Sequence, residues 1–320
     1  MTTEPFTYDE SVIGKEVDVA TFEVTRESVA TYCKALEETN PLWTDDEAAK
    51  RGPYGGITVP PGYMMTLTAR GGPNASVKFG NSGFLGGKHV TMLAPVRPGD
   101  SILMREQVKE VYAKTGRTGT MVFAIRRATY LRDGEVVAIV DTPSVYRETA
   151  TVATATEPPA ERRPSRPVHA STPVVGQRYF EDVEPGEEFE SNWSVSREQV
   201  EAYVRITSMG GNMGAESYFL NEGTAARSGL ERPIAHGGLT TSIALKLVTD
   251  WVGERGWLRN MEATFRRPAM HGDHLRVIGL VTDTQVEDGR GIVKLDVYLE
   301  NERGERPVQA VAIAELPLRG

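Results

Sequence analysis

The chain has 320 residues, of which 39% are hydrophobic and 25% charged, and its formal net charge at pH 7 is −8. This composition is typical of a globular protein of about two domains, each long enough to bury a core. The negative charge argues against nonspecific binding to nucleic acid or to an anionic membrane, because both need a basic face.

The first half predicts a strand, a helical segment and then four strands. Thr25 is a good N-cap for the first helix, and Gly71-Gly72-Pro73 ends the third helix early. The expected elements are a strand over residues 17–24, helices over 26–38, 45–51 and 63–68, and strands over 89–93, 101–112, 118–131 and 136–146.

The second half predicts the same plan after a linker. Residues 149–176 are rich in Thr, Ala and Pro, which favours an extended boundary between domains at 1–148 and 177–320. The expected elements are a strand over residues 189–195, helices over 196–207 and 238–251, and strands over 258–265, 275–284, 291–300 and 308–316.

The two halves also repeat each other in sequence. Residues 24–32 are echoed by 195–203, 48–52 by 225–229, and 95–100 by 268–273, with offsets of 171, 177 and 173. Such echoes indicate a duplication, in which differences between the copies show which one kept a site. A helix packed on an antiparallel sheet in each half predicts the α+β class, with the two sheets paired edge to edge.

Motifs in both halves resemble known families. In the second half, residues 179–186, the run Arg232-Pro233-Ile234-Ala235-His236-Gly237-Gly238, and residues 265–268 resemble a MaoC-type domain of the hotdog fold. In the first half, residues 38–45, 54–57 and 60–61 resemble the dehydratase-like domain often fused before a MaoC domain. The resemblance implies a double hotdog, in which each antiparallel sheet wraps a central helix. Its implied activity is that of R-specific enoyl-thioester hydratases and 3-hydroxyacyl-thioester dehydratases.

The chain departs from the family at its catalytic motif. MaoC hydratases carry Gly-Asp-x-Asn-Pro-aliphatic-His-x-Asp after the first helix, and the Asp and the His act together on water. The first copy has Glu38 and Trp43 in those two places, and the second copy, residues 208–216, has neither an Asp nor a His. Neither half therefore carries the pair.

The remaining candidates surround the start of the second copy's central helix. Gly237 and Gly238 are expected to offer backbone N–H groups to an enolate oxygen, whereas the aligned Pro60 and Pro61 have none. His236 is a candidate general base, or alternatively a structural side chain that fixes the turn. Glu216 is a second candidate base, or a solvated carboxylate, and Asn212 is a candidate to hold the water.

Charged residues further along suggest how a carrier would bind. Arg266 and Arg267 are expected on opposite sides of a strand, where one of them contacts a phosphate of coenzyme A or phosphopantetheine; solvated strand charges are the alternative. His271 and His274 read as surface histidines. We expect no metal and no redox cofactor, with coenzyme A or phosphopantetheine entering only as part of the substrate.

The sequence thus predicts a hydro-lyase acting on an acyl-CoA or acyl-carrier-protein substrate. The alternatives are an inert thioester-binding protein and a hotdog thioesterase that uses Glu216 as base. Because hotdog units often pair further, we expect a homodimer, and no nucleic acid or membrane partner. A cytoplasmic location is expected, since no basic-then-apolar leader is present and the longest apolar helical run, residues 239–252, is too short to cross a bilayer.

Overall fold

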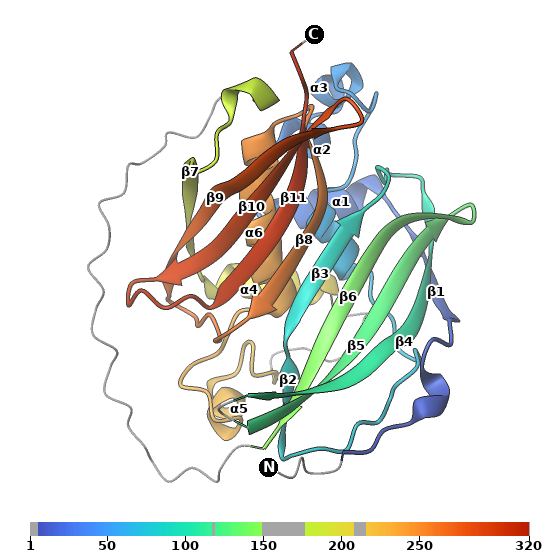
Figure 1. Ribbon diagram of the computed structural model, residues 1–320, viewed down its shortest axis with the longest axis vertical. Helices are drawn as coiled ribbons and strands as arrows, with labels where there is room; N and C mark the ends of the chain where they lie inside the picture. Colours follow the sequence, from blue (N-terminus) through green and yellow to red (C-terminus); the bar gives the residue numbers. More distant parts are fainter. Residues whose placement is uncertain (1–5, 117–118, 149–176, 208–215, 320) are drawn as a thin grey trace.

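The computed structural model describes residues 6–116, 119–148, 177–207 and 216–319. The predicted linker and Asn212 lie outside these residues. Within them, eleven strands form one antiparallel sheet in the order β1-β4-β5-β6-β3-β8-β11-β10-β9-β7, and β2 pairs with the end of β6 on the same edge as β3 (Figure 1). The α+β class is confirmed.

The strands follow the alternating patterns of the sequence closely. Their bounds are β1 Val17–Glu23, β2 Ser82–Leu85, β3 Gly87–Met92, β4 Ser101–Gly116, β5 Gly119–Arg132, β6 Glu135–Arg147, β7 Glu188–Ser194, β8 Trp257–Phe265, β9 His274–Glu287, β10 Arg290–Asn301 and β11 Val308–Leu316. β3 and β8 pair over Gly87↔Thr264 to Thr91↔Asn260, so the two halves meet edge to edge, as predicted. Each half thereby covers one exposed sheet edge of the other.

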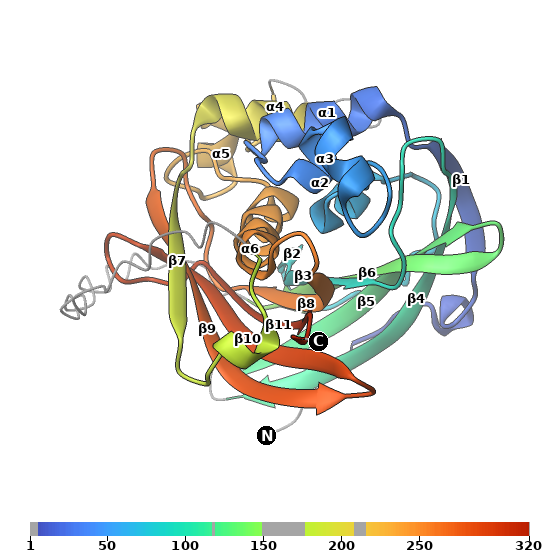
Figure 2. The ribbon, with the colours of Figure 1, turned by 90° about the horizontal axis from the view of Figure 1, so that it is seen from above.

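Helices fill the concave side of this sheet in two layers. Their bounds are α1 Arg26–Ala35, α2 Pro41–Thr44, α3 Asp46–Arg51, α4 Arg197–Thr207, α5 Glu222–Arg227 and α6 Gly237–Val252, with 3-10 helices η1 Glu10–Val12, η2 Pro61–Thr66 and η3 Phe180–Asp182. In α6, 13 of the 16 residues are buried, as expected for a helix that packs against other elements on most of its sides. Figure 2 shows α6 held by the sheet below and by α1 and α4 side by side above it.

Several predicted boundaries were wrong for local reasons. The first helix ends at Ala35 instead of residue 38, because Glu37 adopts a left-handed backbone with φ of 52°. The third helix is the six-residue 3-10 helix η2, so the described residues of the first half contain no counterpart of the long α6. The strand that was expected to carry Arg266 and Arg267 ends at Phe265.

Candidate functional site

The start of α6 is capped by a side chain that the sequence had suggested as a base. His236 is the N-cap, and its Nδ1 accepts a hydrogen bond from the N–H of Gly238 at 3.0 Å. The backbone carbonyl of His236 accepts from the N–H of Thr240 at 3.1 Å. One of the two predicted oxyanion donors, Gly238, is therefore already engaged by protein, which corrects the prediction for that residue.

The amide of Gly237 remains at the helix start. Among the described residues nothing accepts a hydrogen bond from its N–H, and the residue is half-buried. A Cβ at this position would lie 2.5 Å from Cε2 of Phe265, so only glycine fits. The hydroxyls of Thr240 and Thr241 donate to the Gly237 carbonyl at 3.0 and 2.9 Å, which holds the first turn in place. Gly237 is thus the better candidate to hold a carbonyl oxygen.

His236 is a neutral ring in a packed environment. Its ring centroid lies 5.5 Å from that of Tyr203 and 5.0 Å from that of Phe219. Burial, and next the charge of Lys88, lower the pKa of His236 to about 4. Because Nδ1 accepts from Gly238, the neutral ring carries its proton on Nε2. A histidine with this pKa and an engaged lone pair is a poor general base, so the structural alternative is the one the geometry favours.

Glu216, the second candidate base, has a hydrogen-bond partner away from this helix start. Glu216 is exposed, and its carboxylate accepts from Nδ2 of Asn221 at 3.4 Å. Within the part of the chain that the structure describes, no hydrogen bond or ion pair joins Glu216 to His236. Its surroundings match the solvated alternative, whereas Asn212 lies outside the described residues.

The two arginines lie beyond the end of β8. Both are exposed, and Arg267 forms an ion pair with Glu305 at 3.4 Å. No ion pair of the Arg266 side chain is present among the described residues, so its guanidinium is open to an anion. The prediction of opposite strand faces is wrong, because both residues follow the last strand residue.

Two further polar side chains near the helix start were missed by the sequence reasoning. Tyr203 on α4 is fully buried, and its hydroxyl finds no hydrogen-bond partner among the described residues; it would touch a Cβ at Gly238. The Nζ of Lys88 on β3 donates to Oγ1 of Thr142 at 3.0 Å. Burial, and next the charge of Arg126, lower the pKa of Lys88 to about 8. A signal for Lys88 existed: it shares its strand face with Val90 and Met92, which are core residues.

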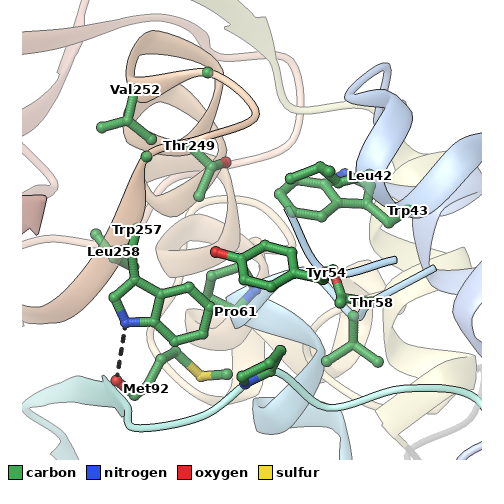
Figure 3. A pocket seen from close by; sticks show the side chains of 14 residues that line it. Leu42, Trp43, Tyr54, Thr58, Pro61, Met92, Thr249, Val252, Trp257 and Leu258 are labelled. Carbon is green, nitrogen blue, oxygen red and sulfur yellow. Dashed lines mark hydrogen bonds between the residues drawn. The ribbon is translucent and has the colours of Figure 1, made fainter. Parts of the chain in front are cut away.

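A pocket lies at the opposite end of α6, beside the first copy's altered motif (Figure 3). Its walls are mostly apolar, and Tyr54 and Trp257 pack edge to face with ring centroids 5.8 Å apart. The free volume of about 30 Å³ has room for a water or two but not for an acyl group. We read this pocket as a packing gap between the two copies.

In the altered motif of the first copy, Glu38 forms an ion pair with Lys246 of α6. Nε1 of Trp43 donates to Oε2 of Glu38 at 3.4 Å, and Nζ of Lys246 lies 3.4 Å from the same oxygen. Burial raises the pKa of Glu38 to about 7, although Lys246 opposes the rise. Glu38, in the place of the family's Asp, therefore bonds to the side chains of Trp43 and Lys246.

Neither a metal site nor a membrane span is found in the described residues. No group of three or more His, Cys, Asp or Glu side chains among them could hold a metal ion. No helix among them has the length and the apolar character needed to cross a membrane.

Both halves of the chain match known protein families. Residues 11–140 match the family described as FAS1-like, dehydratase domain region, and residues 220–303 match the MaoC like domain. A UPF0336 protein of Streptomyces coelicolor is 25% identical over 146 residues, which are 43% of this chain and 95% of that protein.

Solved structures agree on the fold. A MaoC-like dehydratase superposes with a TM-score of 0.73 at 18% identity, covering 96% of this chain and 99% of the other. A conserved hypothetical protein of Mycobacterium tuberculosis with a double hotdog fold gives a TM-score of 0.59 at 14% identity, covering 95% and 96%. The fold of the chain is therefore a double hotdog.

Proposed function

Residues 11–140 belong to the FAS1-like dehydratase domain region and residues 220–303 to the MaoC-like domain, and from this premise we propose that the chain is an acyl-thioester hydratase or dehydratase. Its substrate in this proposal is an enoyl or 3-hydroxyacyl thioester of coenzyme A or of a carrier protein. No metal or redox cofactor takes part, and the active protein is a homodimer.

One observation carries the proposal: the N–H of Gly237 stands without an acceptor among the described residues at the start of a buried helix. Hydration of an enoyl thioester builds negative charge on the carbonyl oxygen as water adds to the β-carbon. A free amide at a helix N-terminus, assisted by the helix dipole, stabilises that charge. The absence of a side chain at Gly237 lets the thioester approach closely.

Proton transfer requires a second group. His236 is a neutral cap, so its part is to orient the helix start and not to act as the base. Glu216 is the one carboxylate of the altered 208–216 segment, and it stays our candidate for the proton transfers, with Asn212 as the candidate to hold water. The guanidinium of Arg266, which forms no ion pair among the described residues, is the candidate to contact a carrier phosphate.

A second candidate function is thioester binding without turnover. Two observations favour it: the missing Asp/His pair, and the engagement of the Gly238 amide by His236. A protein of this kind would hold an acyl thioester or complement an active partner. No observation favours a thioesterase over these two.

The test is incubation of the purified protein with trans-2-enoyl-CoA and 3-hydroxyacyl-CoA esters. Loss or gain of the conjugated enoyl absorbance supports the lyase, release of free thiol would support the thioesterase, and binding in a calorimeter without either would support the inert protein. Glu216→Gln should abolish hydration if Glu216 is the base. Glu222→Gln, another exposed glutamate nearby, is the matched control and should leave hydration unchanged.

A further inference from the structure

On the inner face of the sheet, one row of side chains is charged in the first half, and the corresponding row in the second half is apolar. In the second half, one cross-strand row runs from β8 to β9 as Met261, Ala312, Leu295 and Val281. All four residues are at most 1% exposed. The matching row from β3 to β4 contains two cations and a hydroxyl, and it consists of Lys88, Thr142, Arg126 and Val108.

The charged row lies where the first half lacks a long helix. In the second half this level of the sheet is covered by α6, which has 16 residues, whereas η2 in the first half has six. Apolar residues are needed only where a helix packs on the sheet. The change from Met261 to Lys88 between the copies therefore accompanies the loss of the helix that would have covered it.

A buried acid completes the charged surface. Glu106 on β4 is 2% exposed, its Oε1 lies 3.6 Å from Nε of Arg126, and its Oε2 has no hydrogen-bond partner among the described residues. Gly72 packs against this carboxylate so closely that a Cβ there would collide with Oε2. With one negative and two positive formal charges, Glu106, Arg126 and Lys88 sum to +1, which one carboxylate would neutralise.

Lys88 lies near the start of α6. Its charge lowers the pKa of His236, and Leu85, three residues earlier, would be 3.5 Å from a Cβ at Gly237. Among the described residues no carboxylate lies within 4.0 Å of Nζ of Lys88, which donates only to Thr142. A half-buried ammonium with no ion pair among the described residues is unfavourable for stability, so its presence beside a candidate site points to a ligand that supplies the opposite charge. Arg126, half-exposed, forms the solvent end of the same surface.

We infer that Lys88 and Arg126 bind a carboxylate on the acyl group, so that the substrate is the monothioester of a dicarboxylic acid. This inference rests on the proposed function, because it takes the Gly237 amide as the place of the thioester carbonyl. Lys88 acts here as a specificity-determining residue, and it leaves the oxyanion site and the proton transfers to other groups. An ammonium–carboxylate hydrogen bond in a desolvated site is directional and strong enough to select such a substrate.

The test compares binding of unreactive esters that differ only in the terminal carboxylate. Succinyl-, glutaryl- and adipyl-CoA are titrated against butyryl-, pentanoyl- and hexanoyl-CoA in a calorimeter. The native protein should bind the best dicarboxylic ester about 10- to 100-fold more tightly than its partner of equal length, on the scale of a charge-assisted hydrogen bond. Equal affinity within all three pairs would overturn the inference.

Variants that copy the second half assign the effect to residues. Lys88→Met, which copies Met261, should remove the preference and leave pentanoyl-CoA binding unchanged. Arg126→Leu, which copies Leu295, should reduce the preference by a smaller factor, because its side chain is 52% exposed. Lys114→Met, an exposed lysine on β4, is the control and should retain the full preference. A preference that survives Lys88→Met would refute the assignment.

Hydration assays separate this inference from the proposed function. The substrates are trans-2-pentenoyl-CoA and trans-4-carboxybut-2-enoyl-CoA, which have equal length. If neither is hydrated but the Lys88-dependent binding preference holds, the lyase proposal fails and the carboxylate site stands. If both are hydrated equally well and without dependence on Lys88, the lyase stands and the carboxylate site fails.

Discussion

Replacing Lys88 by methionine should make the protein more stable, and the gain should depend on pH. Burial lowers the pKa of Lys88 from its ordinary 10.5 to about 8, so the folded protein binds a proton there less readily than the unfolded chain does. The charged side chain therefore opposes folding below pH 8, and this opposition disappears as pH rises toward 10.5. Methionine keeps the apolar stem and has no charge to bury.

The size of the effect follows from the two pKa values. At pH 7 the ionised lysine costs the folded state about 3 kcal/mol, at pH 9 about 2 kcal/mol, and at pH 10 about 1 kcal/mol. The groups that face Lys88 are Thr142 on β6, Arg126 on β5, Glu106 on β4 and His236 at the start of α6. His236 has its pKa near 4, so it stays neutral from pH 7 to 10 and adds nothing to the change.

Urea denaturation of the native protein and of Lys88→Met at pH 7, 9 and 10 measures this difference. We expect the free energy of unfolding of the variant to exceed that of the native protein by about 3 kcal/mol at pH 7 and by about 1 kcal/mol at pH 10. Lys114→Met, at an exposed site, should show no such trend. A difference that is flat with pH, or a variant less stable at pH 7, would show that the Lys88 ammonium is not poorly solvated, and the reasoning would fail. A more stable variant that has lost ligand preference would be a trade between stability and function.

Three further predictions concern the helix start and the first copy. Gly237→Ala should lower the free energy of unfolding by about 1–3 kcal/mol, because its Cβ would lie 2.5 Å from Cε2 of Phe265. Gly56→Ala, whose Cβ would have nothing within 4 Å, should leave the free energy of unfolding unchanged. Equal denaturation midpoints for the two variants would contradict this prediction. His236→Ala should cost about 1 kcal/mol at pH 7 through the lost cap. The difference in free energy of unfolding between the native protein and this variant should shrink as pH falls from 6.5 toward 4, since the histidine takes up a proton in the unfolded chain first. A difference that stays constant over this pH range would argue against a neutral ring. Between pH 5 and pH 8, the free energy of unfolding of Glu38→Gln should rise by about 3 kcal/mol relative to that of the native protein, because burial raises the pKa of Glu38 to about 7 and its ionisation opposes folding. If the urea midpoint of the native protein rises relative to that of the variant instead, the ion pair with Lys246 outweighs the cost of burial.

Much of the fold could be read from local patterns. The alternation of apolar residues placed β11 at Val308–Leu316 without error, and Thr25 marked the start of α1 as a capping residue. What local patterns missed were short elements with little periodicity, such as β2 and α2. The end of α1 was also misplaced, because the left-handed backbone of Glu37 is unusual for a residue with a side chain.

The candidate site was predicted only in part. The glycine pair before a long apolar run identified the start of α6, where the N–H of Gly237 has no acceptor within the described part of the chain. The sequence left open whether His236 is a base or a structural side chain at the turn, since a histidine at that position serves either role. The choice depended on the direction of one ring nitrogen and on the packing of Tyr203 and Phe219 around it.

The sequence by itself determined the duplicated α+β plan, because repeated motifs and the spacing of apolar residues are properties of neighbouring positions along the chain. Only the tertiary structure decided that Lys88, Thr142 and Arg126 form one charged row, since strand register brings together residues 16 to 54 positions apart. The same structure showed the matching row of the other copy to be apolar under α6. The physical reason is that burial and charge pairing depend on what packs against a side chain, and a sequence does not state which helix is long enough to cover it.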